Sequence, residues 1–494
     1  MSRAEAVPQA RLSFALGRGR KNAIPVALCQ DGLAMTLMDA LSRIDRISWN
    51  VIGPEDDGYD DARQTFNATI DRRPAAIVQC RSTTDVVAAV RAARDSGVAI
   101  AVRGGGHAVA GHAVADGALV VDLRQMRRVD VDPVRRVARA QGGALWEDVD
   151  GATTAHGMAT TGGTFGDTGI GGLTLTGGIG YLMGTFGLTC DNLVRAEVVT
   201  ADGSIVIAGD DGDPELLWAL RGGGGNFGVV TEFAFSIHRL GPLQSGAISV
   251  PLEHARAALA VAAEIARQDV LGLTIFAVGP TFDLVDGVQP DPATAPPVVR
   301  IGIAFQGSTE DAESAIRLLR DLPGAAGRVI PATYLELQAR TGTLPFGLRH
   351  YWKGHFVRDL DAGAIDAVTR ALETTPPGMS FMLLEAITGR ARSEPAGGAA
   401  FGQRDARWNV SALSIWERPS EDGSMIEWAR RSAEALAPSS LSGAGYGNYA
   451  SADESAERVR ASFGAERFDR LSRVKRRYDP GNVFRFNHNI PPGD

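Results

Sequence analysis

The chain has 494 residues, a formal net charge of -8 at pH 7, 44% hydrophobic residues and 22% charged residues. This composition is ordinary for a globular protein with a large buried core, and the length allows two or three domains. The negative net charge argues against nucleic-acid binding, which normally needs a basic face. No apolar run approaches the ~20 residues of a membrane span.

The three cysteines, Cys29, Cys80 and Cys190, lie far apart in the sequence and form no CxxC pair. This spacing indicates neither a disulfide framework nor a zinc site, so we expect no metal and a reducing, cytoplasmic location. Residues 1–35 contain a short apolar piece broken by a proline and no secretion signal. We expect this stretch to be a weakly structured extension.

The first regular elements predicted along the chain are a buried strand at residues 74–80, a helix at 82–97 and a strand at 98–103. The order strand, helix, strand predicts two parallel strands of one sheet. Three glycines and a histidine follow at residues 104–107. They stand at the carboxyl end of a strand, where ligands commonly meet α/β sheets.

Further elements follow in the same region. Strands are predicted at residues 117–123, 135–143 and 229–238, a hairpin at 193–209, and helices at 145–157 and 213–221. Residues 160–192 are rich in glycine and lack the periodicity of one helix. Such a segment needs a partner surface to order it.

The composition and the hydrophobic pattern change between about residues 243 and 440. Glycine becomes rarer there, and alternating strands interleave with amphipathic helices. This pattern predicts a second domain with an antiparallel sheet backed by helices. Residues 290–297 are predicted as a loop, and residues 468–480 as a helix.

Residues 223–228 match the GxGxxG pattern of dinucleotide-binding folds. That fingerprint must follow a strand and open a helix, whereas here it follows a predicted helix and opens a strand. We therefore reject a Rossmann phosphate loop and predict a tight turn that could lie against a ligand.

The two glycine-rich loops, 104–107 and 160–192, could pack on both sides of a diphosphate and supply bare N–H donors. No Walker lysine follows either loop, so a long, diphosphate-bridged cofactor is favoured over a nucleoside triphosphate. Taken alone, His107 could equally be an incidental surface residue in a turn.

Five segments resemble, in the same order, the motifs of the berberine-bridge-enzyme-like FAD-linked oxidases, which belong to the vanillyl-alcohol-oxidase-type flavoproteins. They are residues 102–123, 162–192, 213–233, 446–453 and 474–492. The resemblance implies an α+β fold with a two-subdomain PCMH-type FAD-binding domain and a substrate domain whose antiparallel sheet is backed by helices. We place these parts at residues 36–242 and 243–440, followed by a segment, 441–494, that returns to the FAD domain.

The resemblance also implies FAD bound covalently through His107 to the flavin 8α-methyl group. A tethered imidazole withdraws electron density and fixes the ring, which makes the flavin a stronger oxidant. Non-covalent FAD beside His107 is the alternative. Many relatives add a cysteinyl link where Phe165 stands here, so we expect a single link, with Cys190 as a buried hydrophobe. Thr168 occupies the position that is thought to control access of oxygen.

The remaining cofactor-binding residues are carried over from the same motifs, although each glycine could serve turn geometry alone. The full set is Arg103, Gly104, Gly105, Gly106, His107, Gly111, Thr168, Gly169, Gly171, Gly172, Gly177, Gly178, Gly180, Asp191, Asn192, Val229, Asn487 and Asn489. Residues 484–492 resemble a strand that returns to the flavin domain.

Catalysis by this family requires a base near the substrate hydroxyl. Tyr449 matches a tyrosine with this role in some relatives, Tyr446 is the alternate, and Glu385 is a second candidate. A free tyrosine has a pKa of ~10, so a cation such as Lys353 would have to lower that pKa.

The resemblance implies oxidation of an alcohol or hemiacetal, on a sugar or secondary metabolite, by hydride transfer to flavin N5. Molecular oxygen would be the acceptor and give H2O2. A dehydrogenase with another acceptor and a flavin-binding module without redox turnover are the alternatives. Neither the substrate nor the oligomeric state can be read from the residues.

Overall fold

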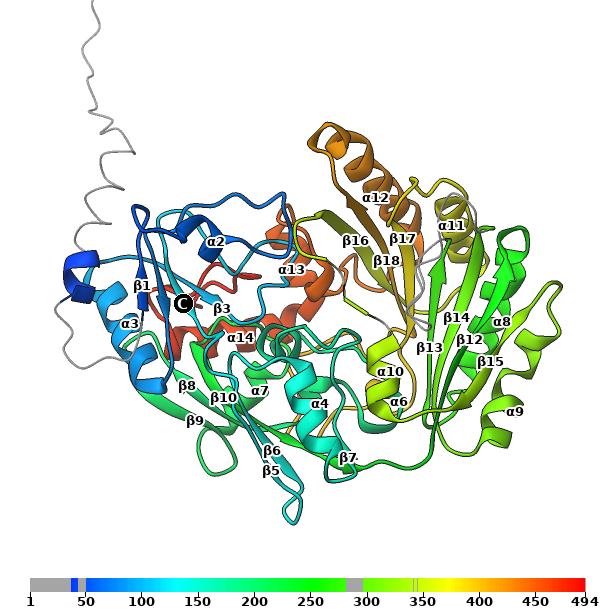
Figure 1. Cartoon of the computed structure of the whole chain (residues 1–494), viewed down its shortest axis with the longest axis horizontal. Coiled ribbons are helices and arrows are strands. Elements are labelled where there is room, and N and C mark those ends of the chain that lie inside the picture. The colour runs from blue at the N-terminus through cyan, green and yellow to red at the C-terminus, as the bar shows by residue number, and fades with distance from the viewer. Residues whose placement is uncertain (1–36, 43–49, 281–295, 341, 344, 494) are drawn as a thin grey trace, which may run out of the picture.

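The structure is a computed structural model that describes residues 37–42, 50–280, 296–340, 342–343 and 345–493. The predicted extension at residues 1–35 and most of the predicted loop at 290–297 lie outside the described residues. The described chain forms two halves, with two smaller sheets in one half and one large sheet in the other (Figure 1).

The first sheet has four strands in the order β1-β2-β4-β3. Its elements are β1 (Asn50–Ile52), α2 (Tyr59–Arg63), β2 (Ala76–Gln79), α3 (Thr83–Asp95), β3 (Ile100–Arg103) and β4 (Leu119–Asp122). β2 and β3 both run parallel to β4, so the parallel strands predicted from the sequence are confirmed, with β4 between them. Helix α3 begins after Ser82, whose hydroxyl accepts from the Asp85 amide in a capping box.

The second sheet is antiparallel, with five strands in the order β5-β6-β10-β8-β9. Its strands are β5 (Val129–Asp132), β6 (Val137–Gln141), β8 (Leu193–Val199), β9 (Ile205–Gly209) and β10 (Val229–Ser236). Around it lie α4 (Trp146–Thr154), α7 (Pro214–Leu220) and the short pair β7 (Met158–Ala159) and β11 (His238–Arg239). The predicted hairpin is confirmed as the β8–β9 pair.

The large sheet has seven strands in the order β15-β12-β14-β13-β17-β18-β16, and each neighbouring pair is antiparallel. The strands are β12 (Leu243–Pro251), β13 (Leu273–Gly279), β14 (Val298–Gln306), β15 (Ala326–Pro331), β16 (Arg349–Val357), β17 (Phe381–Ala386) and β18 (Trp408–Trp416). Helices α8 (Ala255–Arg267), α9 (Thr309–Arg320), α11 (Ala362–Glu373) and α12 (Asp422–Leu436) cover one face (Figure 1). The predicted sheet backed by helices, and the α+β class, are confirmed.

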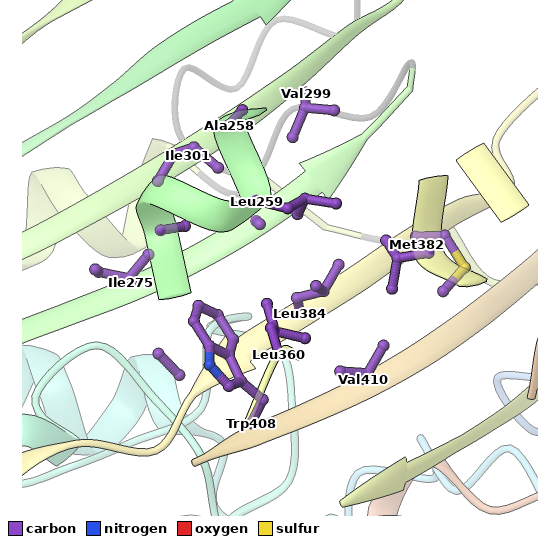
Figure 2. Packing of buried hydrophobic residues seen from close by; sticks show 14 of the residues in the cluster. Ala258, Leu259, Ile275, Val299, Ile301, Leu360, Met382, Leu384, Trp408 and Val410 are labelled. Atoms are coloured by element: carbon purple, nitrogen blue, oxygen red, sulfur yellow. The ribbon is translucent and has the colours of Figure 1, made fainter. Parts of the chain in front are cut away.

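A continuous hydrophobic cluster fills the space between this sheet and its helices. Figure 2 shows Leu259 of α8 packed near Ile275 and Ile301, and Trp408 near Leu384 of the neighbouring strand. Trp408 is fully buried, and truncating such a residue to Ala typically costs about 3–5 kcal/mol. This packing makes the sheet a rigid wall.

The opposite face of the large sheet points toward the first half. Side chains alternate along a strand, so Phe381, Leu383 and Glu385 of β17 share this face while their neighbours join the helix-side cluster. All six residues of β17 are buried. Antiparallel strands commonly alternate between apolar and polar residues, because one face of the sheet meets solvent. β17 lacks this alternation because protein covers both faces of the sheet here.

The glycine-rich segment forms no long helix, as its lack of periodicity predicts, but two short α-helices, α5 (Ile170–Leu175) and α6 (Met183–Phe186), and the 3-10 helix η1 (Thr189–Asn192). The turn between α5 and α6 includes Gly178, which has a φ of 87°, a left-handed conformation that favours glycine. The hydroxyl of Tyr446 accepts hydrogen bonds from the amides of Gly178 and Ile179 at 2.9 and 3.1 Å. A residue from the far end of the chain therefore orders this segment.

Helices α13 (Ala456–Phe463) and α14 (Ala465–Tyr478) bring the chain back to the first half, in orange and red in Figure 1. The ammonium of Lys475, fully buried on α14, donates to Asp479 Oδ2 at 2.6 Å, to the Asn226 carbonyl at 2.8 Å and to the Phe484 carbonyl at 2.9 Å. This lysine joins the loop at residues 223–228 to the C-terminal segment.

The C-terminal segment contains no strand between residues 481 and 493, all of which the structure describes, so the predicted returning strand is wrong. Hydrogen bonds to side chains hold this segment in place, without the backbone pairing of a β-strand. The Asn226 carboxamide donates to the His488 carbonyl at 3.2 Å and accepts from the Ile490 amide at 3.0 Å.

Helix α10 (Tyr334–Arg340) joins the large-sheet half to α4 of the other half through a buried polar contact. The Gln338 carboxamide donates to Asp150 Oδ2 at 2.8 Å and to the Gly163 carbonyl at 3.0 Å. Burial raises the pKa of Asp150 to about 8, and the hydrogen bond from Gln338 opposes this shift. The carboxyl group is therefore protonated at neutral pH.

We expect Asp150→Asn to remove a loss of stability that the wild type shows as the pH rises from about 4 to about 8. The folded-state pKa lies above the ordinary value, so the stabilisation by the protonated carboxyl is complete below pH ~4 and is lost as the pH rises to about 8. The free energy of unfolding should fall by roughly 1 kcal/mol per pH unit in that window for the wild type only. Chemical denaturation at several pH values measures this, with the exposed Asp405→Asn as control. Equal pH dependence of wild type and Asp150→Asn would contradict the prediction.

Candidate functional site

A cavity of about 270 Å³ lies where the two halves meet. The loop after β3, the loop before α5, the turn at residues 223–228, the inner face of the large sheet and the segments 446–450 and 484–488 all line it. Six parts of the fold that lie far apart in the sequence therefore build one enclosure.

The two glycine-rich loops touch each other through bare backbone. A Cβ placed on Gly105 would lie 2.5 Å from the Gly169 amide nitrogen, and a Cβ on Gly169 would overlap the Gly105 amide nitrogen. Real Cβ atoms do not approach backbone so closely, so neither position tolerates a side chain in this arrangement. This contact gives the glycines at these two positions a physical reason.

The main chain of the first loop offers unused donors toward the cavity. The amides of residues 104–107 donate no hydrogen bond to any residue that the structure describes. A Cβ on Gly172 or Gly225 would meet no protein atom within 4 Å, although both glycines line the cavity. Bare N–H groups beside open space are suited to an anionic group such as a diphosphate.

His107 is enclosed by aromatic side chains at one end of the cavity. Its ring stacks on Phe66 with centroids 4.9 Å apart and meets the edge of Phe346 at 5.3 Å. Burial lowers the pKa of His107 to about 4, and the backbone of Asp167 opposes that shift. The imidazole is therefore neutral at pH 7, with one ring nitrogen carrying a lone pair.

Glu385 is the acidic side chain of the large sheet that reaches the cavity, and it is only 1% exposed. The Tyr449 hydroxyl donates to Oε1 at 2.9 Å, and the Asn409 carboxamide donates to Oε2 at 2.6 Å. Glu385 and Asn409 face each other in the β17–β18 register. Burial raises the pKa of Glu385 to about 7, while the two hydrogen bonds oppose the shift. A carboxyl group with this pKa can both accept and release a proton at neutral pH.

The tyrosines have no cation that would make them acidic. Lys353 lies 3.4 Å from Glu454 Oε2 and 3.8 Å from Asp453 Oδ1, so it is paired with carboxylates. Burial, followed by the charge of Glu385, holds the pKa of Tyr449 well above its ordinary value. The expectation that Lys353 lowers the pKa of Tyr449 is therefore wrong.

Many of the residues predicted from sequence meet at this cavity. Those that line it are Gly104, Gly105, Gly106, His107, Thr168, Gly169, Gly171, Gly172, Glu385, Tyr446, Tyr449 and Asn487. Phe165, where relatives were expected to have cysteine, lines it too. The two cysteines that the structure describes, Cys80 and Cys190, are buried elsewhere.

The other predicted residues lie behind the cavity wall within the described chain. They are Arg103, Gly111, Gly177, Gly178, Gly180, Asp191, Asn192, Val229 and Asn489. Arg103 donates to the Ala62 carbonyl beneath the first loop, and Asp191 pairs with Arg404. These contacts fix the loops that carry the lining residues.

Three residues of the site were not singled out from the sequence as members of it. Asn409 is brought to Glu385 by the register of two strands, which the sequence does not reveal. Trp352 meets the edge of Tyr449 with ring centroids 5.5 Å apart, but in the sequence it is only one aromatic residue of an alternating strand. Asp167 stands where the sequence departs from its relatives, and that departure is the signal that could have drawn attention to it.

The described residues hold neither a metal-binding cluster nor a membrane-spanning helix. No group of three or more His, Cys, Asp and Glu side chains there is arranged to hold a metal ion. No helix in the same ranges has the length and apolarity needed to cross a membrane.

Two family models match stretches of the chain that contribute to the cavity lining. Residues 74–209 match an FAD binding domain, and residues 445–491 match the model described as berberine and berberine like. The two matches contain the glycine loops and the segment that carries Tyr446 and Tyr449.

Among curated proteins, (R)-6-hydroxynicotine oxidase of Paenarthrobacter nicotinovorans is 32% identical over 460 residues, which cover 90% of this chain and 97% of that protein. The crystal structure of 6-hydroxy-D-nicotine oxidase from Arthrobacter nicotinovorans has a TM-score of 0.81 and 30% identity, and the match covers 92% of this chain and all of that one.

A more distant structure is glucooligosaccharide oxidase from Acremonium strictum, which carries a 6-S-cysteinyl, 8α-N1-histidyl FAD. It is 24% identical with a TM-score of 0.79, and the match covers 93% of this chain and 99% of that chain. Together with the two glycine loops that meet at Gly105 and Gly169, the full-length similarity to a curated oxidase shows that this chain belongs to the berberine-bridge-enzyme-like family of FAD-linked oxidoreductases.

Proposed function

We propose that the protein oxidises a hydroxyl-bearing carbon of a small substrate, an alcohol or a hemiacetal, and passes the electrons to O2 to give H2O2. FAD bound in the cavity would supply the two-electron acceptor, taking a hydride at flavin N5. The observation that carries the proposal is the buried Glu385 carboxyl, held by Tyr449 and Asn409 in the cavity that the glycine loops enclose.

The cavity suits FAD on the chain's own chemistry. The free amides of residues 104–107 are donors for the diphosphate, and the bare backbone at Gly172 and Gly225 leaves room for it. The buried side-chain carbonyl oxygen of Asn487, which lines the cavity, has no partner among the described residues and is available as an acceptor. His107 would form the single covalent link, because Phe165 cannot provide a sulfur.

Glu385 is the proposed base. It takes the hydroxyl proton of the substrate, and Tyr449 and Asn409 hold the carboxyl group at a fixed angle. Tyr446 is assigned a structural role, because its hydroxyl already accepts from Gly178, Ile179 and Asn448. These contacts favour Glu385 over either phenol for the proton transfer.

The lining around Glu385 favours a substrate with an apolar or ring-shaped face. Trp352, Phe381, Leu383 and Leu413 surround the carboxyl group and exclude water. Aromatic walls stack on the C–H faces of sugars as well as on aromatic rings. Two relatives are named for compounds of these two kinds. One is a hydroxynicotine oxidase, whose name refers to an aromatic compound, and the other is a glucooligosaccharide oxidase, whose name refers to a sugar.

Glu385→Gln should slow flavin reduction by about 10²- to 10⁴-fold, the usual contribution of a positioned base, without loss of bound FAD. Stopped-flow mixing with candidate alcohols under anaerobic conditions measures the bleaching of the flavin, and admission of air then tests for H2O2. Glu417→Gln is the matched control, because this glutamate is exposed and does not line the cavity. Reduced flavin that survives air but is reoxidised by a quinone would indicate a dehydrogenase. Colour that no candidate substrate bleaches would indicate a binding module.

The proposed link predicts that the yellow colour stays with the polypeptide after acid precipitation and maps to the peptide that contains His107. His107→Ala should release all flavin into the supernatant, because Cys80 and Cys190 are buried away from the cavity. His112→Ala is the matched control and should keep the colour. Release from the wild-type protein would contradict the link.

Gly169→Ala should abolish FAD retention, because the new methyl group would overlap the Gly105 backbone and separate the two loops. Gly151→Ala on α4 is the control, since a Cβ there meets no atom within 4 Å. The ratio of flavin absorbance to protein absorbance after gel filtration is the measurement. Full flavin content in Gly169→Ala would show that the loop contact is not required.

A further inference from the structure

Asp167 lies beside His107 although the two belong to different loops. Its Oδ2 is 3.7 Å from His107 Nε2, and the two side chains are only 23% and 17% exposed. Asp167 comes two residues before Gly169, and His107 comes two residues after Gly105. The close approach of those two glycines therefore fixes the distance between the carboxyl group and the imidazole.

The carboxyl group of Asp167 serves no other contact that would explain its burial. Its Oδ1 is buried and has no hydrogen-bond partner among the residues that the structure describes. Leaving a buried polar atom unpaired is unfavourable, because the atom loses its hydrogen bonds to water. A side chain kept in this position at such a cost suggests a role toward its neighbour.

We infer that Asp167 is a positioning residue for the attachment of FAD to His107, by holding the ring proton on Nε2 and accepting that proton when the bond forms. The inference rests on the proposed covalent link. A carboxylate next to Nε2 favours the tautomer with its proton there, which leaves the lone pair on Nδ1.

The bond change balances with O2 as the oxidant. A C–H bond of the 8α-methyl group breaks, the Nδ1–C bond of His107 forms, and the Nε2 proton passes to Asp167. The two electrons released enter the flavin and then reduce O2, which takes up the two protons to give H2O2. The product is oxidised flavin joined to a neutral imidazole.

The charges around the pair set its pH range. Burial raises the pKa of Asp167 to about 6, its own backbone amide opposes the shift, and Glu147 adds to it. Glu147 is itself paired with Arg127 at 3.2 Å. Near His107, burial lowers the pKa of His350 to about 3, so that ring is neutral. Above pH ~6 the pair is carboxylate and neutral imidazole, the forms that the step requires.

The test follows attachment rather than turnover. Wild type, Asp167→Asn and Asp167→Glu are produced in riboflavin-starved cells, mixed with FAD at several pH values, and sampled for acid-stable flavin. Glu147→Gln is the matched control, because it removes an exposed neighbouring carboxylate that pairs with Arg127.

We expect Asp167→Asn to bind FAD yet attach it about 10- to 100-fold more slowly, the usual effect of losing a carboxylate that orients a histidine. The wild-type attachment rate should fall as the pH drops through about 6, and Asp167→Asn should lack this inflection. Asp167→Glu should restore part of the rate.

Three results would overturn the inference. Asp167→Asn could attach FAD with the wild-type rate and pH profile, or Glu147→Gln could slow attachment equally. Failure of both Asp167 variants to bind FAD at all would assign the residue a purely structural role. A wild type that never retains acid-stable flavin would instead refute the proposed link to His107, which distinguishes the two failures.

Discussion

The site depends on one steric condition: two backbones must touch at Gly105 and Gly169. This contact holds the loop after β3 against the loop before α5, and it sets where His107, Asp167 and Thr168 stand. The lost side chains remove obstruction on the cavity side as well. Both the enclosure and the geometry around the histidine therefore follow from the absence of two methyl groups.

The large sheet contributes Glu385, the second group on which the proposed reaction depends. Its helix-side cluster makes it rigid, and its inner face presents Glu385 among apolar side chains. Desolvation by that face brings the pKa of Glu385 to about 7, and the register with Asn409 orients its carboxyl group. The packing that stabilises the sheet thus also sets the surroundings of Glu385, the proposed base.

Motifs, periodicity and the family resemblance were enough to predict the α+β class, the parallel strands before residues 104–107, the sheet backed by helices and the two glycine-rich loops that line the cavity. They rely on local sequence, and so they failed where the outcome depends on distant partners. Asn409 meets Glu385 through strand register, and Lys353 pairs with Glu454 and not with a tyrosine. The end of the chain contacts Asn226 by side-chain hydrogen bonds and forms no strand.

The anchor at Lys475 has a consequence for how the protein is made. This ammonium group ties the turn at residues 223–228 to Phe484, and residues 484–488 close one wall of the cavity. These residues are translated after both glycine loops, so the loops are made before the segment that covers them. A chain that stops before residue 475 would lack both the Lys475 anchor and this wall of the cavity.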